Sequence, residues 1–192
     1  MLPTAQAFGF MILWAVQFFI FLVYMPTFTE SYAGLSHATA LWSNTAGLLL
    51  LMAAIPLFGH MSDRVGRKPL LLDSCLVFIV LPYPMFSAIL AGASSLTILL
   101  IQLVFAIAIA MYSGPGPAAI SEIFATRGRT TQMSIANGTA VAIFGGFAPY
   151  IATWLIDRTG SPIAPTYYAI AAAVVTGAVI MGLRESARTQ LR

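Results

Sequence analysis

Charged side chains are scarce in this sequence. Only 8% of its 192 residues are Asp, Glu, Lys or Arg, while 59% are hydrophobic and the mean hydropathy is +0.90. A soluble domain carries about 25% charged residues, so this chain could not cover its own surface in water. The formal net charge of +3 is also too small to form a nucleic-acid-binding stripe. The composition therefore predicts an integral membrane protein whose partner is the lipid bilayer, and it argues against nucleic acid as a partner.

Several chemical signatures are absent as well. The single cysteine, Cys75, lies inside an apolar run, so no intrachain disulfide can form. The sequence contains no H-E-x-x-H, no G-x-S-x-G and no pair of aspartates at the middle of an apolar stretch, and His37 and His60 fall in or near opposite loops. The N-terminus has no basic residue before its first apolar stretch, which argues against a cleaved secretory signal. We therefore expect neither an enzyme nor a cofactor or metal site.

The gaps between charges divide the chain into membrane spans. Residues 1–29 carry no charge, and neither do the 48 residues from Ser74 to Ser121, which suffice for two spans. About 20 apolar residues cross the hydrocarbon core. The sequence therefore predicts an all-α polytopic membrane protein, a single domain over residues 1–192. Its six predicted helices lie at about 5–26, 40–60, 70–90, 95–117, 130–156 and 166–183.

The basic residues orient these helices. Eight of the nine Lys and Arg residues fall on one face of the six-span arrangement, and Arg158 alone falls on the other. Basic loops stay on the cytoplasmic side, so both termini are predicted to be cytoplasmic in a bacterial-type inner membrane. The eight residues are Arg64, Arg67, Lys68, Arg127, Arg129, Arg184, Arg188 and Arg192.

A short sequence pattern, D-R-x-G, occurs twice and indicates an internal repeat. Asp63-Arg64-Val65-Gly66 follows the second predicted helix, and Asp157-Arg158-Thr159-Gly160 follows the fifth, 94 residues later. An odd number of spans separates the two, so they fall on opposite faces of the membrane. An inverted three-plus-three repeat produces this arrangement.

The polar segment 59–68 carries the most specific pattern. It reads G-x-x-x-D-R-x-G-R-K and resembles the signature loop of the major facilitator superfamily, between the second and third helices of a six-helix half. Asp63 can accept from backbone N–H groups at a helix N-terminus, and Gly66 can adopt a positive φ to close the turn. The alternative is a basic turn that only obeys membrane topology. The resemblance implies a gating loop formed by Gly59, Asp63, Arg64, Gly66, Arg67 and Lys68.

A second loop, 121–129, resembles the E-x-F-P-T-x-x-R stretch of metabolite:proton symporters, with Ala125 in place of proline. Segments 23–26, 148–155, 164–168 and 183–187 extend this resemblance along the whole chain. We expect Glu122 to form a cytoplasmic charge pair, with Arg127 or else with Arg64 or Arg67. A solvated loop glutamate of little energetic value is the alternative.

The resemblance implies the C-terminal half of a twelve-helix carrier, with the first six helices absent. Its implied function is secondary transport of a small organic acid, or a zwitterion such as proline or betaine, together with a proton. The implied partner is an N-terminal six-helix half or a second copy. Asp73 is expected just inside the third helix and Glu30 just outside the first, so the coupling carboxylate is expected on the missing half. An inactive remnant or a non-transporting membrane subunit is the alternative.

Polar residues within the predicted spans are candidates for the substrate pathway, since such groups face a bundle interior or cavity. Each can equally act as an interhelical hydrogen bond. Trp14, Trp42 and Trp154 are interpreted as packing residues or interface anchors. Backbone breaks are predicted at 82–84, 114–117 and 145–149, where Gly and Pro interrupt the helices. The pathway candidates are Gln17, Tyr24, Asn44, Gln102, Tyr112 and Asn137.

Overall fold

The computed structural model describes residues 3–123 and 129–183. Six of its helical segments are long and apolar enough to cross a membrane, and the described part of the chain contains no β-strand. The predicted all-α, six-span architecture is therefore confirmed. The segments are Thr4–Ala33, His37–Val65, Arg67–Leu90, Ser95–Glu122, Met133–Thr159 and Pro165–Gly182.

Four of these spans are built from more than one helix. The first joins α1 (Pro3–Phe18), a π-helical turn η1 (Phe19–Tyr24) and α2 (Met25–Ala33). The second is α3 (His37–Val65), and the third joins α4 (Arg67–Val80) to α5 (Pro82–Leu90). The fourth joins α6 (Ser95–Ser113) to α7 (Gly116–Ile123). The fifth joins α8 (Arg129–Ala140), a second π-helical turn η2 (Val141–Gly146) and α9 (Ala148–Thr159), and the last is α10 (Pro165–Gly182).

The first span is longer than predicted. Pro26 does not end it, because this proline lies in the first turn of α2, where a missing N–H is tolerated. The helix continues to Ala33 and ends at Gly34, which has a φ of 68°. Glu30 therefore lies inside the last turns of α2 rather than just outside the helix.

The backbone breaks fall where proline and glycine predicted them, with one addition. Regular helix is interrupted at Leu81, between Ser113 and Gly116, and along η2. The π-helical turn η1 has no glycine or proline of its own and was not predicted. A π-helical turn inserts one extra residue into the i→i−4 ladder, so the sequence pattern of an apolar helix gives little sign of it.

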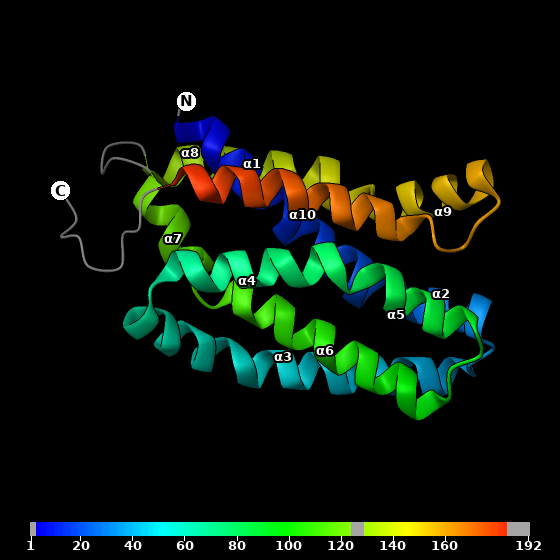
Figure 1. Cartoon of the computed structure of the whole chain (residues 1–192). Helices are drawn as coiled ribbons and strands as arrows, with labels where there is room; N and C mark the ends of the chain where they lie inside the picture. Colours follow the sequence, from blue (N-terminus) through cyan, green and yellow to red (C-terminus); the bar gives the residue numbers. More distant parts are fainter. Residues whose placement is uncertain (1–2, 124–128, 184–192) are drawn as a thin grey trace.

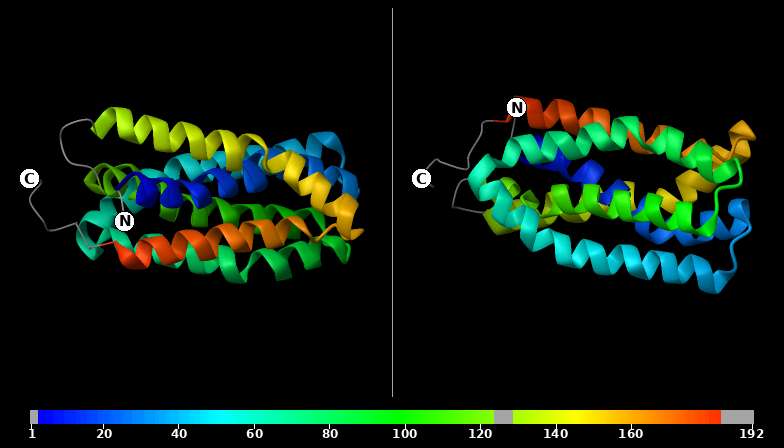
Figure 2. Two further views of the ribbon diagram at one scale, coloured as in Figure 1. Left: turned by 90° about the horizontal axis from the view of Figure 1, so that it is seen from above. Right: turned by 60° about the horizontal axis from the view of Figure 1, so that its bottom comes forward.

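The helices run along one another in a single bundle (Figure 1). α4 and α10 lie side by side, and α10 also packs on α1. Seen from above, α10 and α8 lie on opposite sides of α1 (Figure 2). α3 packs along α6 at the bottom of Figure 1. The beginning of α1, the end of α10 and the turn at Gly66 share one end of the bundle, called here the Gly66 end.

Aromatic rings fill the bundle interior. Phe21 is buried, and its ring centroid lies 4.2 Å from that of Phe105 and 5.1 Å from that of Phe78. Phe86 packs on Phe21 at 5.9 Å in an edge-to-face arrangement. Because lipid tails are as apolar as these side chains, close packing rather than hydrophobic burial stabilises such a core in a membrane.

Candidate functional site: a cleft and a charged turn

A cleft of about 380 Å³ opens on the side of α1 that faces away from α4 and α10. Met11, Ala15 and Ile120 form its buried floor. Its wall and rim residues come from α1, the two π-helical turns, α7 and α8, and none comes from α3 to α6 or from α10. They are Trp14, Phe18, Phe19, Pro117, Met133, Ser134, Asn137 and Val141.

Trp14 is the best-supported wall of the cleft. Its ring lies edge-to-face with Phe10 at 6.2 Å and with Tyr112 at 6.0 Å. The Tyr112 hydroxyl donates to the Phe10 backbone carbonyl at 2.7 Å, which fixes the Tyr112 ring against α1. A Cβ atom on Gly116 would lie 3.0 Å from the Trp14 ring, so only glycine leaves the ring its present position without a shift.

Phe19, the first residue of η1, forms the neighbouring wall. A Cβ atom on Gly145, in η2, would lie 2.7 Å from the Phe19 ring and 3.4 Å from Ala15 Cβ. The two π-helical turns therefore meet at this glycine, directly beside the cleft. Such turns occur often at functional sites.

Ser134 and Asn137 supply the polar edge of the cleft. They lie one turn apart on α8, and both are exposed. Exposed polar side chains within a membrane-spanning helix are costly against lipid, so this side of α8 is suited to a water-filled path or to another protein surface. No lining residue among the described ones is charged.

The structure distinguishes among the six pathway candidates, of which Asn137 alone lines the cleft. Asn44 accepts a 2.7 Å hydrogen bond from the Gln102 side-chain amide, so this pair joins α3 to α6 as interhelical glue. Tyr24 and Tyr112 are buried in the core. Gln17 is fully buried, and its amide makes no hydrogen bond within the described residues.

Sequence reasoning missed the aromatic wall. Trp14 was interpreted as a packing residue or interface anchor, and the structure shows it lining the cleft as well. The spacing Trp14–Phe18, facing Ser134–Asn137 on the fifth span, was the available signal. It could not be read without knowing that α1 and α8 are neighbours. Trp42 and Trp154 lie elsewhere and are 74% and 46% exposed.

The turn at Gly66 brings charged residues together. Gly66 is buried with a φ of 112°, as predicted, and its N–H donates to the Ser62 carbonyl at 3.0 Å. Arg67 begins α4 and forms an ion pair with Glu122 at the end of α7. The Arg67 guanidinium also lies 3.8 Å from the Asp63 carboxylate. Glu122 therefore pairs with Arg67, one of its three predicted partners. Arg127, another of the three, lies outside the described residues.

The remaining loop residues have separate surroundings. Asp63 is 68% exposed and does not cap α4, which has no side-chain cap. Arg64 is exposed in the last turn of α3. Lys68 donates from Nζ to the carbonyls of Met181 and Leu183, at 2.7 and 2.8 Å, and so ties the turn to the end of α10.

Gly59 lies at a close helix crossing near the same turn. A Cβ atom on Gly114 would lie 2.7 Å from the Gly59 nitrogen and 3.0 Å from the Ile55 carbonyl oxygen. Small residues allow two membrane helices to approach this closely. The ends of α3 and α6 are thereby held together beneath the charged turn.

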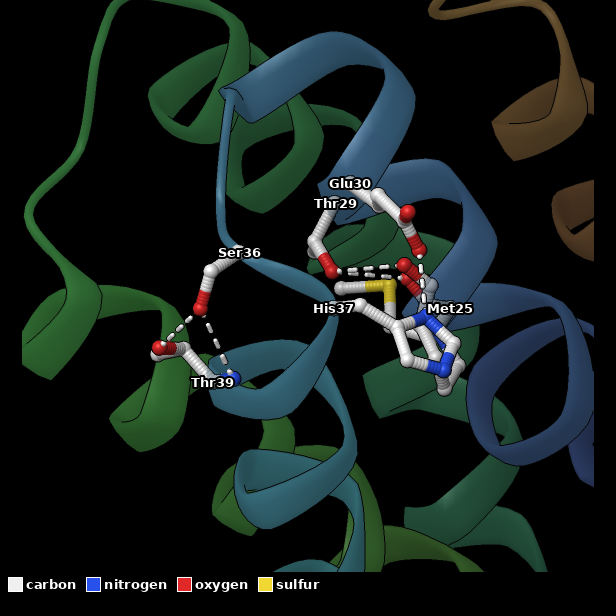
Figure 3. Close-up of polar contacts among 7 residues, drawn as sticks. Met25, Thr29, Glu30, Ser36, His37 and Thr39 are labelled. Carbon is white, nitrogen blue, oxygen red and sulfur yellow. Dashed lines mark hydrogen bonds and ion pairs between the residues drawn. The ribbon is translucent and has the colours of Figure 1, made fainter.

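The opposite end of the bundle carries a weaker polar cluster, between α2 and α3 (Figure 3). His37 Nδ1 lies 2.9 Å from Glu30 Oε2, and both side chains are largely exposed. Ser36 caps α3 by accepting from the Thr39 N–H at 3.2 Å. Within the described residues no group of three or more His, Cys, Asp or Glu side chains could hold a metal ion.

These features define a polytopic membrane protein with a cleft on one side and a charged turn at one end. Residues 7–191 match the Major Facilitator Superfamily, and the chain belongs to this family. This is a family of transporters rather than of enzymes. The pattern of the 59–68 loop and the six-span architecture agree with this membership.

Three relatives show what the chain is similar to. It is 29% identical over 168 residues to the ectoine/proline transporter ProP of Corynebacterium glutamicum, covering 88% of this chain and 33% of the relative. It is 32% identical over 163 residues to a citrate-proton symporter of Klebsiella pneumoniae, covering 82% and 35%. A putative proline/betaine transporter of Staphylococcus aureus is 29% identical over 171 residues, covering 85% and 35%. The chain therefore spans about a third of the length of these relatives.

Proposed function

We propose that this chain forms one six-helix half of a secondary carrier and that its cleft is one wall of the solute pathway. The observation that carries the proposal is the cleft itself, which combines aromatic walls with the exposed polar residues Ser134 and Asn137 within a span. A volume of about 380 Å³ suits a small organic molecule. The relatives are named as transporters of ectoine, proline, betaine or citrate, so the solute is a small organic acid or zwitterion.

The carrier requires a second half. All lining residues of the cleft come from one side of the pathway, and the rim residues Phe18 and Asn137 remain exposed. An N-terminal six-helix half, or a second copy of this chain, completes the enclosure. The exposed carboxylate of Asp63 then caps a helix N-terminus of that partner and steadies one access state.

Orientation and coupling follow from the distribution of charge. The excess of Lys and Arg in the loops on one side of the six spans supports a cytoplasmic location for that side and for both termini, in a bacterial-type inner membrane. The citrate-proton relatives support proton coupling. No carboxylate lines the cleft within the described residues, so the titrating carboxylate belongs to the partner half.

Reconstitution into proteoliposomes tests the proposal. The chain is incorporated alone and together with a co-expressed N-terminal six-helix half, and uptake of labelled proline, glycine betaine and citrate is measured under an inward proton gradient. Saturable, gradient-driven uptake of any of these solutes by the two halves supports a carrier. Absence of uptake in correctly inserted, co-purifying halves favours a non-transporting membrane subunit.

Assembly is tested separately by size-exclusion chromatography in mild detergent. The partner hypothesis predicts a homodimer, or a complex with the N-terminal half. A chain that stays monomeric in both experiments contradicts it.

A further inference from the structure

Two hydroxyl groups from different helices bond to consecutive carbonyls of α1, just before the part of α1 that lines the cleft. Thr176, fully buried on α10, donates to the Gly9 carbonyl at 2.8 Å and accepts from the Leu13 N–H at 3.1 Å. Tyr112, buried on α6, donates to the Phe10 carbonyl at 2.7 Å. We propose that Thr176 and Tyr112 form a hydroxyl clamp that fixes this turn of α1 and thereby positions the aromatic wall of the cleft. This positioning role goes beyond the proposed carrier function and is the same whichever solute is carried.

The clamp engages backbone groups that hold an α-helix together. In a regular helix the carbonyl of each residue accepts from the N–H four residues later. The clamp therefore acts on two consecutive steps of this ladder, the second of which ends at the Trp14 N–H. A side chain that inserts into the ladder is one of the few causes of a local helix bend. The direction of α1 beyond Phe10 thus depends on where α6 and α10 hold its two carbonyls.

Thr176 bonds differently from three other threonines within the spans. A threonine in a membrane helix can donate to the carbonyl four residues earlier in its own helix. Thr29, Thr45 and Thr153 do so, at 2.9 to 3.1 Å. Thr176 instead uses its hydroxyl proton and a lone pair for an acceptor and a donor of α1. Its hydroxyl therefore ties α10 to the backbone of α1.

Gly9 lets α10 approach closely enough for this bond. A Cβ atom on Gly9 would lie 2.7 Å from Val179 Cγ2, one turn beyond Thr176 on α10. Small residues allow two membrane helices to come this close. Because α10 and α8 lie on opposite sides of α1 (Figure 2), Thr176 holds α1 from the side away from the cleft edge on α8.

The clamped turn adjoins the stretch of α1 that lines the cleft. Trp14, Ala15 and Phe18 all line the cleft, and they lie between the clamped turn and the start of η1. At the start of η1, the Phe19 ring packs against Gly145 of η2. One end of the stretch is thus bonded to α6 and α10, while the other is packed on η2. Side chains fixed in this way lose little conformational freedom when a solute binds, so the clamp acts on a bound solute through the wall.

Substitutions that delete one hydroxyl test the clamp in the purified full chain. Trp42 and Trp154 are first replaced by Phe, which leaves Trp14 as the only tryptophan. Thr176→Val and Tyr112→Phe then each remove a hydroxyl and keep the shape of the side chain. We expect each variant to shift Trp14 emission to longer wavelength and to raise its acrylamide quenching constant about two- to threefold. The reason is that losing one hydrogen bond raises the population of a loosened turn about 2- to 10-fold.

Three further variants separate the clamp from a general loosening of the bundle. Thr176→Ser keeps the hydroxyl and should leave Trp14 emission and quenching as in the parent chain. Thr45→Val is the matched control, because the exposed Thr45 hydroxyl bonds within α3, and it should not change Trp14 either. The double variant Thr176→Val with Tyr112→Phe should loosen Trp14 by more than the two single variants added together, since each single variant keeps one hydroxyl on the turn.

Unchanged Trp14 signals in both hydroxyl-deleting variants, in chains that keep their helical spectrum, would overturn the inference. An equal change in Thr45→Val would do the same, as would a loosened Trp14 in Thr176→Ser. If Thr176→Val does not fold, Tyr112→Phe decides, because it retains the ring that packs on Trp14. The readout needs no transport: loosening of Trp14 supports the clamp even if two reconstituted halves take up no labelled proline, glycine betaine or citrate, a result that counts against the carrier proposal instead.

Discussion

Two helix interfaces of this bundle contain similar residue types, glycine and side-chain amides, but one is closely packed and the other borders a cleft. Between α3 and α6, Gly59 and Gly114 allow backbone contact, and the amides of Asn44 and Gln102 bond to one another. Between the first and fifth spans, the π-helical turns meet at Gly145, while the amide of Asn137 remains exposed at a cleft. The first interface is closed, whereas the second leaves a cleft with an exposed amide side chain at its edge. An amide in these helices is thus either hydrogen-bonded across an interface or exposed at a cleft, according to which helix faces it.

Of the five substitutions predicted here, Gly114→Ala in the closed interface should lower the free energy of unfolding most. The new Cβ atom would meet Gly59 and Ile55 backbone atoms at 2.7 and 3.0 Å, and backbone cannot move aside as a side chain can. We expect a loss of about 1–3 kcal/mol, as for other overpacked sites, measured by denaturation in detergent. Gly138→Ala on α8 is the matched control, because nothing lies within 4 Å of its added Cβ. Equal losses at both glycines would refute the close-contact explanation.

The amide pair should give the next largest effect. Gln102→Leu removes the 2.7 Å hydrogen bond to Asn44 and leaves that amide unpaired between two helices. We expect a loss of about 0.6–2 kcal/mol in the free energy of unfolding. A double-mutant cycle with Asn44→Leu checks the pairing, since the double variant should lose less than the two single variants added together. Full additivity would mean that the two amides do not stabilise each other.

The open interface should respond differently to the same kind of substitution. Gly145→Ala places its Cβ atom 2.7 Å from the Phe19 ring, which is a side chain and can turn away. We expect a loss below about 1 kcal/mol in the free energy of unfolding, because the ring can relax, together with a several-fold fall in solute binding, because the moved ring is a wall of the cleft. Phe19→Leu in the same chain should restore part of the stability. If Gly145→Ala bound solute as the original chain does, the contact between the two π-helical turns would have no influence on the cleft.

The charged turn should contribute little to stability and much to transport. Asp63 is 68% exposed and only 3.8 Å from Arg67, so Asp63→Ala should cost less than about 1 kcal/mol in the isolated chain. In the two-half carrier the same variant should severely reduce uptake, because a helix N-terminus of the partner loses a cap worth about 0.5–2 kcal/mol and the access equilibrium shifts several-fold. Asp63→Asn should be milder, since asparagine still caps. Undiminished uptake by both variants would show that the turn sets membrane topology but has no role in transport.

The far end of the bundle should give the smallest effect. His37→Ala removes the 2.9 Å contact with Glu30, but both side chains are largely exposed (Figure 3). Exposed ion pairs contribute about 0–1 kcal/mol, so the free energy of unfolding should change by less than the effect of Gln102→Leu. The measurement is the same denaturation experiment at neutral pH. A loss as large as that of Gln102→Leu would show that the connection between α2 and α3 stabilises the bundle after all.

Much of the fold could be predicted without coordinates. The six spans follow from apolar runs bounded by charges, and the positive φ of Gly66 follows from its place in a four-charge turn. The breaks near Pro82, Gly114 and Gly145 follow from clustered Gly and Pro residues, which weaken a helix where they occur together. The end of the first span was misplaced, because Pro26 looks like a terminator when the helix is assumed to be a single regular piece.

The sequence by itself therefore determined the membrane environment, the number of spans and the charged turn at 59–68. Each of these depends on composition or on neighbours along the chain. Only the tertiary structure decided which polar residues are satisfied. In the folded chain, Asn44 is hydrogen-bonded to Gln102, the Tyr112 hydroxyl is hydrogen-bonded to the Phe10 carbonyl, and Asn137 lines a cleft together with Trp14. The physical reason is that an amide in a membrane helix has the same local sequence signature in each case. Its role depends on which helix lies opposite, and that is set by the packing of helices distant in sequence.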